Sequence, residues 1–133
     1  MKKVFALLCL TALTLFASCG DDDSNNTNDK IVGTWRYTGY IDENGTFDPE
    51  TDEDLECYED LLTFNKNGTG QVVSKDCDFG DDSYQIQWSK GNGDMYIFSY
   101  DDETEQAKVT FEGNTTMKFH YEGLEADVFK RVQ

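Results

Sequence analysis

The sequence predicts an all-β fold: a single small up-and-down antiparallel β-barrel of about eight strands, preceded by a signal peptide and a flexible tether. Short segments with alternating apolar and polar residues recur along the chain, which is typical of strands with one buried face. Turn signals separate these segments at Asn44-Gly45, Asn67-Gly68, Asn92-Gly93 and Gly113-Asn114. Consecutive strands joined by tight turns favour a barrel because closure removes exposed sheet edges.

The elements follow in order. The first predicted strand covers residues 34–41 and is followed by a long acidic loop, residues 42–56, where residues 53–60 form one helical turn at most. A hairpin then pairs residues 60–65 with residues 69–74. The remaining strands are marked by Tyr84, Ile86 and Trp88; by residues 94–100, apolar on both faces; by Ala107, Val109 and Phe111; by Met117, Phe119 and Tyr121; and by residues 128–132.

The first residues have the pattern of a secretory signal peptide. Lys2 and Lys3 precede a short apolar run, and small residues precede Cys19. The run is too short for a permanent membrane anchor of about 20 residues. The ending Phe-Ala-Ser-Cys resembles a bacterial lipobox, which implies that Cys19 carries fatty acyl chains such as palmitate. We therefore expect a signal peptide in residues 1–18, an acidic tether in residues 19–30 and one domain in residues 31–133.

The net charge of −16 becomes −18 when Lys2 and Lys3 leave with the signal peptide. Such a chain repels phosphate backbones, which argues against a nucleic-acid partner. We interpret the charge as a means of keeping a cell-surface protein soluble, with attraction of divalent cations or cationic peptides as the alternative.

The positions of the four cysteines predict different roles for them. Cys9 belongs to the signal peptide and Cys19 is the lipidation site, so Cys57 and Cys77 remain as a pair in an oxidising compartment. A disulfide is the natural expectation for this pair. Two cysteines and one histidine make a zinc-type metal site an unfavourable interpretation.

The residues around the first strand resemble those of lipocalins. Gly33-Thr34-Trp35 matches their Gly-x-Trp start, and residues 57–69 are similar to the second-strand region of lipocalin-like lipoproteins of Bacteroidetes. The resemblance places Arg131 over Trp35, where a cation–π contact would close the barrel base. It implies a non-enzymatic binding protein that is lipid-anchored in the bacterial outer membrane, facing either the periplasm or the outside.

No catalytic constellation is visible in the sequence. It has no phosphate-binding glycine loop, and strand alternation places its one histidine, His120, outward beside Lys118. We predict no enzymatic activity and no cofactor. The acidic loop of residues 42–60 and the cluster Asp76, Asp78, Asp81 and Asp82 raise the alternative of calcium, although we favour solvated loops.

The inward aromatic residues define the candidate ligand site. They either line a pocket for a small apolar ligand or fill a barrel that is just wide enough for side chains. In the second case the protein is a protein- or glycan-interaction module that works through its surface. We expect a monomer, and the candidate ligand-binding residues are Tyr37, Phe64, Tyr84, Trp88, Phe98, Phe111 and Phe119.

Overall fold

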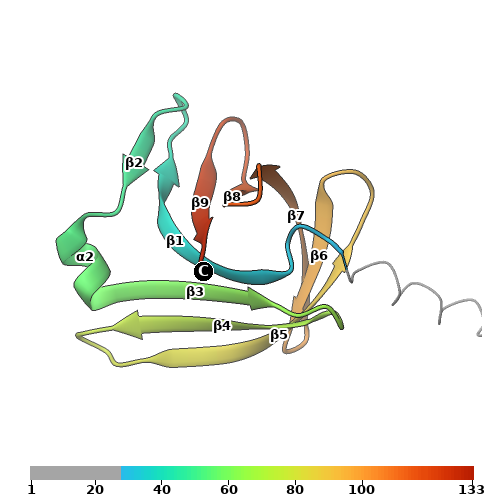
Figure 1. The fold of residues 1–133 in the computed structure, drawn as a ribbon, viewed down its shortest axis with the longest axis horizontal. Helices are drawn as coiled ribbons and strands as arrows, with labels where there is room; N and C mark the ends of the chain where they lie inside the picture. Colours follow the sequence, from blue (N-terminus) through green and yellow to red (C-terminus); the bar gives the residue numbers. More distant parts are fainter. Residues whose placement is uncertain (1–27) are drawn as a thin grey trace, which may run out of the picture.

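The computed structural model describes residues 28–133, so the predicted signal peptide, Cys19 and most of the tether lie outside the described residues. Nine strands form one antiparallel sheet in which β1 also pairs with β9, and this pairing closes an eight-stranded barrel with β2 as an extra strand (Figure 1). The predicted all-β up-and-down barrel is confirmed. Its elements are β1 Gly33–Ile41, β2 Phe47–Pro49, α2 Asp52–Cys57, β3 Tyr58–Phe64, β4 Thr69–Asp76, β5 Asp82–Lys90, β6 Met95–Tyr100, β7 Glu103–Glu112, β8 Thr116–His120 and β9 Ala126–Arg131.

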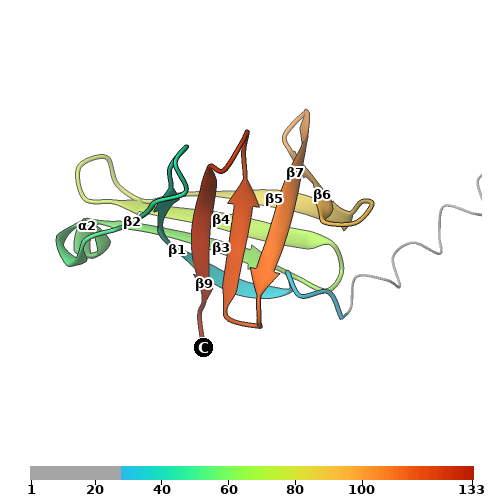
Figure 2. The ribbon, with the colours of Figure 1, turned by 90° about the horizontal axis from the view of Figure 1, so that it is seen from above.

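Strand β1 closes the barrel because it pairs with β3 on one edge and with β9 on the other. Its first half pairs with β3, its last residues pair with β2, and β9 runs along its other edge. The register with β9 shifts between Tyr37 and Gly39, as at a β-bulge. The resulting bend is visible in Figure 1, and Figure 2 shows β7, β8 and β9 crossing the direction of β3, β4 and β5.

The acidic segment between the first two barrel strands has more structure than the sequence predicted. It contains β2 and the short helix α2 in place of one continuous loop. Thr51 begins α2 with a capping box: its hydroxyl accepts a hydrogen bond from the backbone N–H of Asp54 at 3.2 Å, and the Asp54 carboxylate accepts one from the N–H of Thr51 at 3.3 Å. Within residues 28–133 no helix is long and apolar enough to cross a membrane.

Aromatic side chains fill the closed end of the barrel. Phe64 packs edge-on against Trp88, with 6.2 Å between ring centroids. The indole of Trp35 is fully buried and donates a hydrogen bond to the carbonyl O of Ile31 at 2.7 Å. The guanidinium carbon of Arg131 lies 4.1 Å from the centroid of the Trp35 ring. The buried core also includes Ile31, Ile86, Tyr96, Phe98, Val109, Met117 and Phe129.

A disulfide joins Cys57, at the end of α2, to Cys77, just after β4. The two Cα atoms are 5.0 Å apart, and the backbone N–H of Cys77 donates to the carbonyl O of Cys57 at 3.1 Å. The predicted disulfide is confirmed. It holds the open end of the β3–β4 hairpin, where the ladder between the two strands stops.

Candidate functional site

A pocket of about 400 Å³ lies at the open end of the barrel, where β3, β5 and β9 begin and β4 ends. Its side chains come from the inward rows of five strands, because every second residue of a strand faces the interior. We call it the mouth pocket. It is lined by Tyr37, Asp60, Leu62, Val72, Ser74, Tyr84, Asp127 and Phe129.

Apolar and aromatic side chains make up five of the eight lining residues. Leu62 and Val72 are cross-strand neighbours on β3 and β4, and Val72 is in turn opposite Tyr84 on β5. The ring of Tyr37 meets the edge of Phe129, with 5.6 Å between centroids. These groups form a surface for the apolar part of a ligand, and this surface contains two accessible aromatic rings.

The other three lining residues, Asp60, Ser74 and Asp127, are polar, and two of them are carboxylates. The Asp127 carboxylate accepts a hydrogen bond from the Tyr121 hydroxyl at 2.5 Å. Burial raises the pKa of Asp127, and the nearby charge of Asp60 raises it further, while the Tyr121 hydrogen bond acts in the opposite direction. Burial and the charges of Asp127, Glu50 and Asp60 raise the pKa of Tyr37 to about 12. The mouth pocket therefore has a negative electrostatic field and holds Tyr37 as a neutral phenol.

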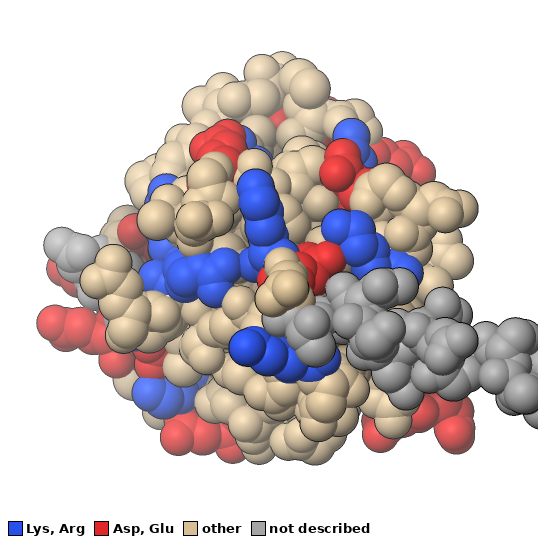
Figure 3. Space-filling model, turned by 45° about the vertical axis from the view of Figure 1, so that its right-hand side comes forward, with Lys and Arg blue, Asp and Glu red and all other residues tan. Residues whose placement is uncertain are grey.

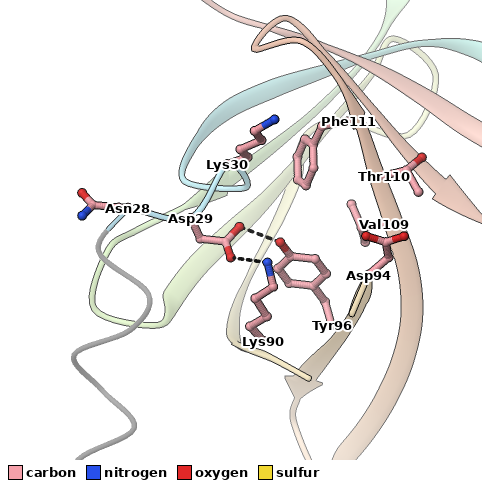
Figure 4. A pocket seen from close by; sticks show the side chains of 9 residues that line it. All are labelled: Asn28, Asp29, Lys30, Lys90, Asp94, Tyr96, Val109, Thr110 and Phe111. Atoms are coloured by element: carbon pink, nitrogen blue, oxygen red, sulfur yellow. Dashed lines mark hydrogen bonds and ion pairs between the residues drawn. The ribbon is translucent and has the colours of Figure 1, made fainter. Parts of the chain in front are cut away.

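A second pocket, of about 590 Å³, lies beside the start of the described chain (Figure 4). The Asp29 carboxylate there accepts a hydrogen bond from the Tyr96 hydroxyl at 2.6 Å and is 3.1 Å from the ammonium of Lys90. Lys90 also lies 5.3 Å from the centroid of the Tyr96 ring. The positive charge of Lys90 neutralises Asp29. We therefore interpret this cluster as a structural contact that fixes residues 28–31 to the barrel base. Figure 3 shows Lys and Arg side chains gathered on the face where the described chain begins.

The structure distributes the seven candidate ligand-binding residues over different layers of the barrel. Only Tyr37 and Tyr84 line the mouth pocket. Phe64, Trp88 and Phe98 are buried in the core, Phe119 packs against it, and Phe111 lines the second pocket. The seven residues therefore do not line one pocket: two line the mouth pocket, and the other five fill the core or pack against it.

Sequence reasoning missed the two carboxylates of the mouth pocket. Asp60 precedes Leu62 and Phe64 in the inward row of β3, and Asp127 precedes Phe129 in that of β9. A carboxylate in an otherwise apolar inward row is unusual, because a buried charge is costly unless it is paired. This break in the alternation is the signal that could have identified the two residues.

The other titratable groups considered from the sequence have structural contacts. The Nε2 atom of His120 is 2.7 Å from the Thr110 hydroxyl, and burial together with Lys108 and Lys118 lowers the pKa of His120. Asp42 and Asp76, which lead the two acidic segments, each accept hydrogen bonds from two backbone N–H groups of their own turns. Among residues 28–133 no group of three or more His, Cys, Asp or Glu side chains is arranged to hold a metal ion.

Comparison with known proteins identifies the fold. No protein-family model matches this chain, and no curated protein matches it. A lipocalin-like protein from Bacteroides uniformis superimposes with a TM-score of 0.60 at 16% identity, over 78% of this chain and 100% of the other. An uncharacterised protein from Bacteroides eggerthii superimposes with a TM-score of 0.57 at 14% identity, over 77% of this chain and 99% of the other.

The chain thus has a lipocalin-like fold.

Proposed function

We propose that this protein binds a small molecule in the mouth pocket and performs no chemistry on it. The observation that carries the proposal is the pocket itself, about 400 Å³ at the open end of the barrel. The pocket of about 590 Å³ at the base is lined instead by the Asp29–Lys90 ion pair that fixes residues 28–31 to the barrel. The volume of the mouth pocket lies near the lower end of the ~300–1,000 Å³ that is usual for small-molecule sites. Leu62, Val72 and Phe129 would hold the apolar body of the ligand.

We further propose that Cys19 is acylated and anchors the domain to the bacterial outer membrane. The N-terminal sequence pattern supports this proposal. Residues 28–31 are held at the barrel base by Asp29 and Arg131, away from the residues of the mouth pocket. A tether that reaches the domain at its base would leave the mouth open to ligand.

Native mass spectrometry of the mature protein, purified from its own host, tests the binding proposal. We expect the wild type to carry a small molecule. Ser74→Phe places a ring in the mouth pocket and should abolish the adduct, whereas Gln106→Phe on the exposed face of β7 should retain it. Bare wild-type protein, or an adduct that survives Ser74→Phe, would contradict the proposal.

A second candidate function is recognition of a protein or glycan by the exposed loops. The observation that favours it is a set of exposed apolar side chains: Phe79, at 92% exposure, and Leu124 in loops, and Phe47 in the short strand β2. Under this alternative the wild type is bare in native mass spectrometry, and Phe79→Ser abolishes binding to a glycan array that Ser74→Phe leaves intact.

A further inference from the structure

We propose that the mouth pocket selects cations: its ligand is a small molecule that carries a protonated amine on an apolar or aromatic body. This inference rests on the proposed function and specifies the class of ligand. Two independent features of the pocket lead to it, the unbalanced charge of its lining and the aromatic rings beside that charge.

The charge of the mouth pocket is not balanced by the protein. Its lining contains Asp60 and Asp127 but no Lys, Arg or His. The ion pairs between side chains of residues 28–133 use the carboxylates of Asp29, Glu59 and Glu112 instead. Two neighbouring carboxylates, one of them half-buried, repel each other and lose hydration, and a bound cation relieves both costs.

The second pocket of the same domain provides an internal comparison. It is lined by two carboxylates, Asp29 and Asp94, and by two lysines, Lys30 and Lys90. Asp29 is paired with Lys90, whose ammonium also approaches the ring of Tyr96. The mouth pocket has carboxylates and tyrosine rings as well, but it lacks the lysine. An amine ligand would take the place that Lys90 occupies at the base, between a carboxylate and the face of a tyrosine ring.

The aromatic lining favours a cation for a separate reason. The faces of Tyr37 and Tyr84 carry negative quadrupole charge, which attracts an ammonium group within about 6 Å. Tyr84 is 47% exposed and lines the mouth pocket, so part of its ring is accessible to a ligand there. An anionic ligand would meet the field of Asp60, Asp127 and the acidic segment around Asp48 and Glu50 without any compensating cation.

Three probes with the same indole body test this inference: tryptamine, which is cationic, tryptophol, which is neutral, and indole-3-propionate, which is anionic. We would titrate the full mature protein at pH 7 by calorimetry and locate each probe by NMR shift changes. We expect tryptamine to bind about tenfold more tightly than tryptophol, with a preference that decreases at high salt, and indole-3-propionate to bind more weakly than both.

Isosteric variants isolate the contribution of the two carboxylates. Asp60→Asn and Asp127→Asn should each weaken tryptamine binding by about fivefold while leaving tryptophol binding unchanged. Asp81→Asn, which removes the same charge from an exposed loop outside the pocket, should leave both affinities unchanged. Urea unfolding of each variant confirms that the fold is intact.

The outcomes separate this inference from the function on which it rests. If tryptophol and tryptamine bind equally at the mouth, or if neither asparagine variant lowers tryptamine affinity, the charge selection is overturned and the binding function stands. If no probe binds, the molecule carried by the native protein decides: an amine supports the inference, and a neutral or anionic molecule overturns it. Bare native protein that binds no probe overturns both.

Discussion

Arg131 links three parts of the chain at the barrel base. Its Nη1 atom donates to the carbonyl O of Val32 at 2.7 Å, and its Nη2 atom donates to that of Lys30 at 2.8 Å. Its Nε atom donates to the carbonyl O of Asn114 at 2.6 Å. Gly33 makes this approach feasible, because its φ is 136° and a Cβ there would collide with the Arg131 guanidinium. The Gly-x-Trp pattern therefore has a physical basis in the space that Arg131 needs.

We predict that Arg131→Lys destabilises the domain by about 1–3 kcal/mol. The planar guanidinium makes three hydrogen bonds while it stacks on Trp35, and the lysine ammonium cannot do both. Urea unfolding at pH 7 measures this loss. The matched variant Arg36→Lys changes an exposed ion pair with Glu59 and should cost less than about 1 kcal/mol. Equal effects of the two variants would show that Arg131 acts only as a surface charge.

Asp127 should reduce the stability of the domain at neutral pH. Because burial and Asp60 raise its pKa, the folded state retains the Asp127 proton at pH values where the unfolded chain, with an ordinary pKa of 3.8, has lost it. Stability therefore falls as pH rises from 3.8 through the raised pKa. The groups that face this carboxylate are Asp60, Tyr121 and Tyr37, and only Tyr121 stabilises its charged form.

We predict that Asp127→Asn removes this decrease and is as stable as the wild type at pH 7, or more stable by less than about 1 kcal/mol. Chemical unfolding between pH 4 and pH 7 gives the slope. A clear loss of stability at pH 7 would mean that the charged hydrogen bond from Tyr121 outweighs the cost of burial. The expected stability also makes this variant suitable for the tryptamine test.

The sequence predicted the barrel strands, but it did not predict the structure of the segment that connects β1 to β3. Most of strands β3–β9 alternate, and all but one of their connections contain Asn or Gly, so local pattern is sufficient to place them. The exceptions are β6, which is apolar on both faces, and the β6–β7 turn, which is formed by Asp101 and Asp102. Strand β2 and helix α2 lie in an acidic segment whose structure depends on contacts with β1 and on the Thr51 cap. The Thr-x-x-Asp spacing at residues 51–54 was the available local signal for the helix.

Gly39 determines the bend of β1. Its φ is 152°, and a Cβ at this position would collide with the carbonyl O of Asp48 and the ring of Phe47 in β2. We predict that Gly39→Ala separates β2 from β1 and destabilises the domain by about 1–3 kcal/mol. Amide hydrogen exchange should report faster exchange at Phe47, Asp48 and Glu50; the Glu50 N–H donates to the carbonyl O of Thr38 at 3.0 Å. Unchanged protection of β2 would show that the strand pair adapts to a side chain.

The disulfide closes a loop of 20 residues that contains the β3–β4 hairpin. Its removal enlarges the conformational freedom of the unfolded chain, so the double variant Cys57→Ser and Cys77→Ser should lose about 3 kcal/mol of stability. Thermal unfolding with and without reductant checks this value, and reductant should lower the wild-type melting temperature but not that of the variant. An unaffected wild type would show that the bond contributes nothing to stability in solution.

For the molecule as a whole, sequence predicted which side chains point inward but not how deep each lies. Tyr37 and Phe64 are equivalent by alternation, yet Tyr37 lines the mouth and Phe64 is in the core. Their depth depends on strand stagger and on the bend of β1, which are set by long-range pairing. The mouth pocket was therefore only partly predictable, since two of the seven aromatic candidates line it and both of its carboxylates were missed.

The two ends of the domain differ in charge and in their relation to the tether. The base carries Lys30, Lys90 and Arg131 close to Asp29, while the mouth carries Asp60 and Asp127. An acyl anchor at Cys19 would hold the basic end nearer the membrane, where lipid phosphates attract lysine and arginine. It would also leave the acidic mouth facing away from the lipid surface.

We predict that Cys19→Ala moves the protein from the membrane fraction to the soluble fraction, because this substitution removes the residue that the N-terminal pattern predicts to carry the acyl chains. Cys9→Ala is the matched control: Cys9 lies within the predicted signal peptide, so this variant should stay with the membrane. The mass of the mature N-terminus supplies a second readout, with acyl chains on Cys19 in the wild type and in Cys9→Ala. The domain begins beyond the substituted residue, so the melting temperature should not change. Membrane retention of Cys19→Ala would contradict lipid anchoring without affecting the proposed ligand site.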